Sequence, residues 1–485
     1  MHSGDPQKDN VGFVTECLLI LKKAAAQKGG VADFTRFVFP TGNFLNEEYR
    51  VRCLFDGATF LEDAVFRRSR FSSDVSFDGA RFLKGTDFSG AEFLGEASFI
   101  QAKFASKADF DGARFKQDAH FLSSKFTGDF LFSRGTVEQK ASFGGAAFDQ
   151  GAHFDGADFE GNVDFLYVTF TGSANFRETK FAQEAKFLGS RFLGPTSFRE
   201  THFRQDDDLH PGPIFSLAQF ERPQSVVFYK TYLGQALFCS CDVSRLTFSS
   251  VVWRRRKGSG KRMLFEEEVD LKDAPELKLG TYSSDELDYG LIAETYQQLK
   301  KNYDDRKDYW TAGDFHYGEM EMKRLHSLRR NSLARWWHRK FSMVAWYKRF
   351  SEYGESYVRP AVWLGVALLV FAFLFPWAGL HPGGNAAQSA LSVAAGQVSP
   401  PASATELSYR NFSRFVDAYP GRKWVAHLAF FGHSLLTAVS VATFQKELRY
   451  EPSYPWGTAL ALLELLLTST LVALFLLAVR RQFKR

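Results

Sequence analysis

Cysteine and methionine are scarce in this chain of 485 residues, which has four Cys and five Met. Four cysteines cannot supply the framework of a disulfide-stapled secreted domain, so that class is excluded. Cys239 and Cys241 have a spacing that could supply half of a metal site, but no second pair of Cys or His matches it. We expect both thiols to be small packing residues, and the sequence predicts no metal and no other cofactor.

A large excess of charge of one sign is also absent, since 60 Lys and Arg stand against 55 Asp and Glu. A formal net charge of +5 does not predict a strong nucleic-acid binder, so no nucleic-acid partner is expected. The first ten residues contain no basic segment that leads into a long apolar run, so no signal peptide is expected. Neither a Ser-His-Asp set nor a carboxylate pair nor a glycine-rich phosphate loop stands out, and no enzyme is predicted.

Phenylalanine, in contrast, is abundant, with 52 residues whose positions repeat. Over residues 55–132 and again over 143–203, Phe recurs in alternating steps of five and six. A small residue precedes many of these Phe by two positions, as Ala80 precedes Phe82. Neither the 3.6-residue period of a helix nor the two-residue period of an ordinary strand fits this spacing. A solenoid fits, because each leg then offers one large and one small side chain to a continuous core.

The pattern resembles the pentapeptide-repeat family, whose repeat centres on a large residue preceded two positions earlier by Ala or another small residue. The resemblance covers about residues 34–253 and implies an all-β, right-handed, four-sided β-helix, with residues 1–33 as an N-terminal cap. Every second leg has one extra residue, so we expect about 22 residues per coil. Ten residues are assigned to the buried structural ladder: Phe77, Phe82, Phe88, Phe93, Phe99, Phe104, Phe110, Phe115, Phe121 and Phe126.

The last third of the chain contains apolar segments that are long enough to cross a bilayer. Residues 358–380 and 456–479 are almost wholly apolar; a polar loop, 381–423, and a third, more polar stretch, 424–446, lie between them. If the third stretch crosses, the basic residues before the first span and the basic tail, 480–485, fall on opposite sides, against the positive-inside tendency. We therefore expect two transmembrane helices and a re-entrant pore helix, with both termini cytoplasmic. Three spans are the alternative.

A basic and aromatic segment precedes the first of these spans. Residues 254–283 are expected to form a basic linker and 284–353 a helical connector. Between 323 and 349 the chain has nine Lys or Arg and no acidic residue. Such a segment can bind nucleic acid, but directly before an apolar span it favours a helix on the membrane surface. The residues assigned to this surface helix are Trp336, Trp337, Arg339, Lys340 and Trp346.

The order of span, outer loop, re-entrant helix and span resembles the two-transmembrane pore-loop channel family over about residues 358–480. The T-V-G-Y-G filter of potassium channels is missing, so potassium selectivity is not implied. The resemblance implies a homo-oligomer, a tetramer by analogy, because one pair of spans cannot enclose a pore. The candidate pore-lining residues are Thr437, Ser440, Thr443, Lys446 and Glu464. An acid inside a span is either a cation site or a structural hydrogen-bonding group, and both readings stay open for Glu464.

These features together predict an oligomeric, channel-like protein of a bacterial inner membrane, with the cytoplasmic β-helix acting as a sensor or gate. Its expected partners are membrane lipid, further copies of itself and ions, with cations expected. The alternative is a membrane-tethered scaffold whose β-helix binds a protein partner, including a role in which the β-helix mimics DNA. Residues 51–210 carry 19 basic and 24 acidic residues, a net charge of −5, which is weak support for such mimicry.

Overall fold

The computed structural model divides the chain into two compact units, Met1–His326 and Ser327–Arg485. The boundary falls inside the segment 284–353, the expected helical connector with its juxtamembrane helix. The residues that the structure describes are 10–27, 29–40, 42–205, 210–269, 288–326, 341–382, 407–417, 423–445, 450–452 and 455–483.

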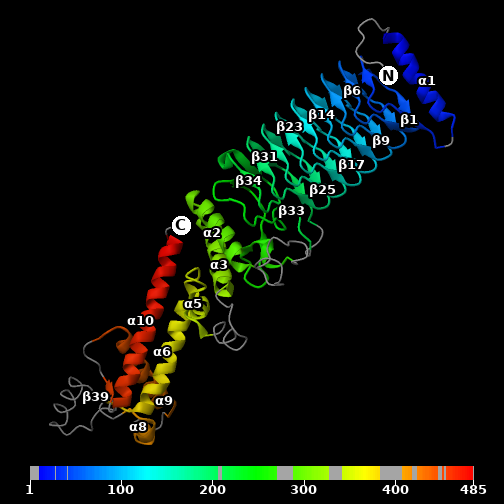
Figure 1. The fold of residues 1–485 in the computed structure, drawn as a ribbon. Helices are drawn as coiled ribbons and strands as arrows, with labels where there is room; N and C mark the ends of the chain where they lie inside the picture. Colours follow the sequence, from blue (N-terminus) through cyan, green and yellow to red (C-terminus); the bar gives the residue numbers. More distant parts are fainter. Residues whose placement is uncertain are drawn as a thin grey trace, which may run out of the picture. The chain divides into compact units, whose positions relative to one another are not determined.

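The first unit is a β-solenoid of about ten turns, which confirms the solenoid predicted from the Phe spacing. A typical coil contains four strands of two residues each, β9 (Val75–Ser76), β10 (Arg81–Phe82), β11 (Thr86–Asp87) and β12 (Glu92–Phe93). The next strand, β13 (Ala97–Ser98), pairs in parallel with β9, so one coil takes 22 residues. Repetition of this step builds four parallel sheets, which run from β1 (Val31–Asp33) to β36 (Thr247–Ser249) (Figure 1).

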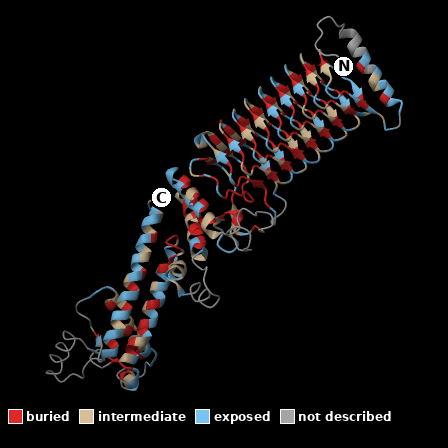
Figure 2. Ribbon diagram, viewed as in Figure 1, coloured by how far each residue is buried: buried red, intermediate tan, exposed pale blue. Residues whose placement is uncertain are grey.

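The core of the solenoid is a set of stacked phenyl rings. Phe82 lies on Phe104 with ring centroids 4.7 Å apart and ring planes inclined by 6°. All ten residues assigned to the ladder are buried, and the buried positions line the inside of every coil (Figure 2). Positive φ angles occur twice in each coil, eleven residues apart, as at Gly79 and Gly90 in one coil and at Gln101 and Gly112 in the next. Glycine adopts this left-handed conformation without a steric penalty, whereas the other residues that hold it need the surrounding coil to enforce it.

The break in the Phe series after residue 132 has a structural explanation. Val137 occupies a ladder position that pairs with Phe115 on one side and Phe159 on the other. The ring of Phe132 moves toward the space that the smaller valine leaves, and its centroid lies 5.7 Å from that of Phe159. Phe130, at a position that pairs with Ala108 and Ala152, then fills the place of the displaced ring. The core volume is therefore kept although the repeat is interrupted.

Both ends of the solenoid are covered. At the start, helix α1 (Asn10–Ala25) buries Cys17 and Ala24 against the same hydrophobic core. At the other end, an antiparallel hairpin, β37 (Arg254–Arg255) and β38 (Arg262–Met263), lies in the first part of the expected linker. It is followed by helices α2 (Tyr289–Asp305) and α3 (Tyr309–His326). Covered ends prevent the stacking of coils from one molecule onto the next.

Helix α2 supplies polar groups to the last coil. The side-chain amide of Asn302 donates hydrogen bonds to the carbonyl oxygens of Val243 (2.9 Å) and Leu246 (2.8 Å). The guanidinium of Arg306 donates to the carbonyl oxygens of Leu246 and Phe248 at 2.7 Å. These carbonyl groups have no further coil to pair with, so the helix satisfies polar groups that would otherwise be buried without partners.

The second unit is helical, with α5 (Met343–Ser351), α6 (Val358–Ala378), α8 (Phe412–Asp417), α9 (Lys423–Ala442) and α10 (Pro455–Phe483). Of the helices described, α6, α9 and α10 are long and apolar enough to cross a membrane. Two three-residue strands, β39 (Leu380–Pro382) and β40 (Tyr450–Pro452), pair antiparallel between these helices. The three long helices agree with membrane association, whereas the number of spans depends on how α9 is placed.

Candidate functional site

Helices α6, α9 and α10 pack together around four buried polar side chains, Ser434, Thr437, Glu464 and Thr468. The hydroxyl group of Ser434 donates a hydrogen bond to the carbonyl oxygen of Ala372, which links α9 to α6. The hydroxyl groups of Thr437 and Thr468 donate to carbonyl oxygens one turn earlier in their own helices, at 3.0 and 2.8 Å. All three hydroxyl protons are therefore committed to the backbone.

Glu464 is fully buried, and neither of its carboxylate oxygens has a hydrogen-bond partner within the described part of the chain. It therefore makes none of the structural hydrogen bonds that we considered for it, as far as the described residues extend. Its side chain also lies inside the packing of one molecule, and the monomer surface does not expose it. An acidic group in such a place is costly unless it is neutral or coordinates a cation.

The other candidate pore-lining residues lie along and just beyond the last two turns of α9, and their exposure increases toward the end of the helix. Thr437 is buried, Ser440 is partly exposed and Thr443 is exposed just beyond the helix. The hydroxyl group of Thr443 donates to the carbonyl oxygen of Val439 at 2.8 Å. The three hydroxyl groups therefore differ in exposure, from buried at Thr437 to exposed at Thr443. Lys446 lies outside the described residues.

The two segments that flank α9 meet the same short strand. Leu407, which precedes α9, exchanges two backbone hydrogen bonds with Leu380 of β39, at 2.8 and 3.0 Å. The strand that follows α9, β40, pairs with β39 over its whole length, with Leu380 opposite Pro452. Leu407 before α9 and β40 after it therefore both lie at the end of α6 that carries β39.

The opposite ends of α6 and α10 are joined by a separate contact. The guanidinium of Arg481, near the end of α10, donates to the carbonyl oxygen of Tyr353 at 2.9 Å. It also pairs with the carboxylate of Glu355 at 3.2 Å. Both acceptors lie in the turn between α5 and α6, so α6 and α10 run antiparallel over their length.

Part of the predicted surface helix is described as α5. Trp346 is exposed there, its ring stacks on Phe350 with centroids 5.2 Å apart, and the guanidinium of Arg349 lies 5.3 Å above it. The other four residues assigned to this helix, Trp336, Trp337, Arg339 and Lys340, lie outside the described residues.

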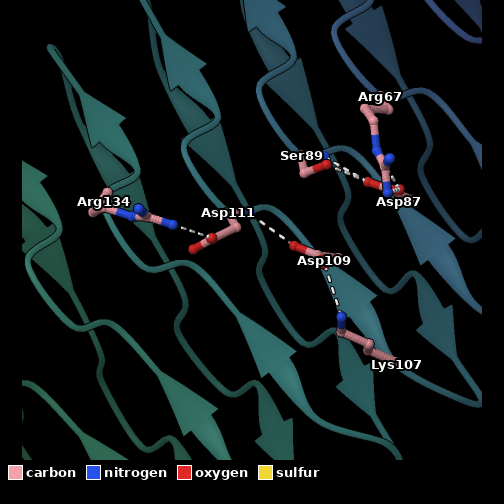
Figure 3. Close-up of polar contacts among 7 residues, drawn as sticks. All are labelled: Arg67, Asp87, Ser89, Lys107, Asp109, Asp111 and Arg134. Atoms are coloured by element: carbon pink, nitrogen blue, oxygen red, sulfur yellow. Dashed lines mark hydrogen bonds and ion pairs between the residues drawn. The ribbon is translucent and has the colours of Figure 1, made fainter.

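Charges on one solenoid face are paired between or within coils. Asp87 accepts from Arg67 at 2.7 Å, Asp109 from Lys107 at 2.9 Å, and Asp111 from Arg134 at 2.6 Å (Figure 3). Partial burial raises the pKa of Asp87, but hydrogen bonds from Ser89 and Arg67 lower it overall, so the pKa lies below the usual aspartate value. These pairs neutralise three acidic positions of this face, which weakens the case for a DNA-mimicking surface.

A second surface feature was missed by sequence reasoning. At a 22-residue interval, Ile100, Leu122, Leu166 and Leu188 occupy equivalent, partly exposed positions on successive coils, interrupted by Gly144. Their spacing within the repeat could have revealed this apolar row, because polar residues hold most other outward positions.

Among the described residues, no group of three or more His, Cys, Asp or Glu could hold a metal ion. A model of pentapeptide repeats matches residues 52–92, 77–125, 88–136 and 165–210. No curated protein and no solved structure matches the chain. The solenoid is thus built from pentapeptide repeats, and it is followed by a unit with three candidate membrane helices.

Proposed function

We propose that the protein is an oligomeric, channel-like membrane protein in which α6 and α10 span the bilayer and α9 is a re-entrant helix. The pentapeptide-repeat solenoid, a right-handed β-helix in this proposal, is its cytoplasmic sensor or gating module. The observation that carries the proposal is the pairing of both α9 flanks, Leu407 and Tyr450–Pro452, with the single strand Leu380–Pro382.

Chain length supports this placement of α9. A helix of 20 residues is about 30 Å long, similar to the hydrocarbon core of a bilayer. Only eight steps connect Ala442 to Tyr450, and even a fully extended chain covers no more than about 29 Å in eight steps. A helix that crossed the bilayer could hardly return to its own entry side within this distance, whereas one that enters partway can.

Side-chain contacts agree with a helix α9 that starts at the β39 end of α6 and runs along α6. His427, in the first turn and a half of α9, lies against the ring of Phe412 with centroids 5.0 Å apart, near the β39 end. One to two turns later, Phe431 contacts Phe373 at 4.8 Å and Ser434 bonds to Ala372, which lie further from that end of α6. The helix therefore descends along α6 from the side on which the chain enters.

The polar end of α9 supports a water-filled path. Thr443 and Gln445 are exposed at the end of the descending helix, where a single molecule would place them against hydrocarbon. Irregular backbone and polar side chains at membrane depth are tolerated where they face protein or water. An assembly of several copies around these residues supplies both, and the carbonyl end of α9 favours a cation there.

Cysteine accessibility separates the re-entrant arrangement from three spans. Single cysteines at Ser399 and Glu451, in a background without the four native cysteines, should both react with an impermeant reagent from outside. Cysteines at Ser259 and Gln482 should react only after the membrane is opened. If the chain crosses three times, the cysteine at position 451 should be protected from the outside reagent and the cysteine at position 482 should react with it. That result would contradict the re-entrant arrangement.

The apolar row on the solenoid favours a second function, a membrane-tethered scaffold that docks a protein partner. Next to this row, Tyr167 exposes 64% of its surface, and its ring lies over Gly189. Apolar groups aligned on successive coils are typical of an interaction surface. Purified oligomers that pass no ion in liposomes under voltage, altered pH or tension would favour this scaffold over the channel.

A further inference from the structure

An open pocket of about 440 Å³ lies where α5 meets the start of α6. Its walls combine two guanidinium groups with apolar side chains. The lining residues are Arg349, Val358, Arg359, Val362 and Trp363. None of these residues belongs to the buried polar cluster of α6, α9 and α10.

This pocket has more cationic than anionic side chains. Arg359 pairs with Glu352, yet half of its side chain remains exposed. Arg349 is exposed and has no ion-pair partner within the described residues; its guanidinium lies over the Trp346 ring. The positive end of the α6 dipole adds to this field, since Val358 begins a helix of 21 residues. The pocket therefore favours a ligand with a net negative charge.

Aromatic rings give the pocket a rigid apolar wall. Trp363 meets Phe350 edge to face at 5.4 Å, and Phe350 stacks on Trp346. Arg359 and Trp363 are one turn apart, so the indole lies about 6 Å further along α6 than the guanidinium. Beyond the pocket the helix exposes Val366 and Leu369. Along α6 the pocket and its surroundings therefore present charged groups first, then an indole, then aliphatic side chains. This order matches the parts of a phospholipid, from its charged headgroup to its acyl chains.

We propose that this pocket binds the headgroup of an anionic phospholipid, with Arg349 and Arg359 on the phosphate and Val362 and Trp363 along the first part of an acyl chain. Guanidinium groups suit this role because they bind phosphate oxygens in pairs. The inference rests on the membrane insertion of the second unit and is independent of whether the protein conducts ions.

The turn behind the pocket gives the ligand a structural consequence. Glu352, Tyr353 and Gly354 all have positive φ angles, and Tyr353 is fully buried. This turn accepts the hydrogen bond from Arg481 at the end of α10. A lipid that holds α5 against α6 therefore also steadies the contact that joins the two proposed spans.

The test uses the full-length protein in dodecyl maltoside and measures lipid affinity by native mass spectrometry, with thermal unfolding as a second readout. Phosphatidylglycerol should bind more tightly than phosphatidylcholine with the same acyl chains, and inorganic phosphate at equal concentration should give no stabilisation. Arg349→Gln should weaken phosphatidylglycerol binding by about fivefold, as expected for one basic group near a lipid surface. Trp363→Ala should weaken both lipids.

Two matched variants control for nonspecific effects. Arg410→Gln removes an exposed arginine near the β39 end of α6, and Trp377→Ala removes an exposed indole near that same end of the helix. Neither should alter the preference for phosphatidylglycerol.

Arg359→Gln also breaks the pair with Glu352, so Arg349→Gln is the decisive variant if Arg359→Gln misfolds. Equal binding of the two lipids, an equal effect of inorganic phosphate, or unchanged affinity in Arg349→Gln would each overturn the proposal. Because the readout is binding in detergent, a negative result here is separate from a failure of ion flux.

Discussion

At the scale of single residues, inward-facing phenyl rings dominate the stability of the solenoid. Many rings stack on a ring in the coil above and on one in the coil below, and they meet rings of a neighbouring column edge to face, as Phe99 does. Phe110, for example, contacts Phe88 at 4.9 Å and Phe99 at 5.4 Å. Such pairs add to the area that the rings bury, so the loss of one ring affects several neighbours at once.

Replacement of Phe110 by Asp should lower the free energy of unfolding by about 4 kcal/mol or more. It removes a buried ring and places an unpaired carboxylate in the same position. The matched variant Arg114→Asp changes an exposed outward residue, and we expect a change within about 0.5 kcal/mol. Thermal unfolding followed by circular dichroism provides the measurement. Equal midpoints for the two variants would show that the inward assignment is wrong.

Val137→Phe would restore the repeat, and it should nevertheless destabilise the protein by about 1–3 kcal/mol. The space beside Val137 is already taken by the displaced ring of Phe132. Restoring a ring at 137 should be tolerated only together with Phe130→Ala, which frees the place that Phe132 would reoccupy. Denaturant unfolding of the single and double variants measures the coupling, and a single variant more stable than the wild type would contradict this account of the core.

At the scale of elements, the terminal caps distinguish this solenoid from a bare stack of coils. The Phe spacing could predict the coils because every position in a repeat meets the same surroundings. It could not predict that α1 covers one end, or that Asn302 reaches the carbonyl groups of the last coil. Those contacts depend on tertiary placement, and residues such as Asn302 look like ordinary polar residues of a helix.

Asn302→Ala should destabilise the end of the solenoid by about 1–3 kcal/mol, since it leaves the carbonyl oxygen of Val243 without its donor and removes one of the two donors to the carbonyl oxygen of Leu246. Gln297→Ala, on the exposed side of the same helix, is the matched control. Hydrogen exchange should show faster opening in the last coil, residues 226–249, and unchanged protection in the coils near Phe110. Uniform protection in the variant would mean that α2 does not stabilise this end.

Helix α3 contains a charge cluster that makes stability depend on pH. Burial raises the pKa of Glu319, but hydrogen bonds from His316, Lys300 and Lys323 outweigh it and hold the pKa well below its usual range. A carboxylate with a depressed pKa stabilises the folded state above its unfolded pKa of about 4.3 and loses this contribution as the pH falls through the folded value. Glu319→Gln should therefore be less stable than the wild type at pH 7. The difference between their melting temperatures should shrink below about pH 4, and a constant difference would exclude this cause.

At the scale of the whole molecule, the apolar segments predicted the candidate membrane helices, whereas the topology needed contacts that no local pattern contains. β39 and β40 have three residues each, too few to recognise in a sequence, yet they place both flanks of α9 at one end of α6. The side of α10 that carries Glu464 was likewise undetermined, because an almost uniformly apolar helix has no preferred face. The burial of Glu464 inside one molecule depends on how α10 packs against its neighbouring helices.

Thr443→Ala should change the cation flux of reconstituted oligomers, because its hydroxyl group is exposed at the end of α9. Thr437→Ala removes the same group from a buried position on the same helix and should leave flux closer to that of the wild type. Liposome flux assays at matched protein incorporation compare the two. Identical flux for the wild type and Thr443→Ala would remove this residue from the conduction path.

The 22-residue coil also sets how the solenoid can change in length during evolution. Removal or duplication of one full coil shortens or lengthens the rod by about 4.8 Å and leaves both caps facing their original directions. A change of 11 residues, which the sequence period equally allows, would turn everything after it by about half a revolution around the rod axis. Insertions of 66 nucleotides are therefore neutral in orientation, and insertions of 33 nucleotides reverse the side on which the chain leaves the solenoid.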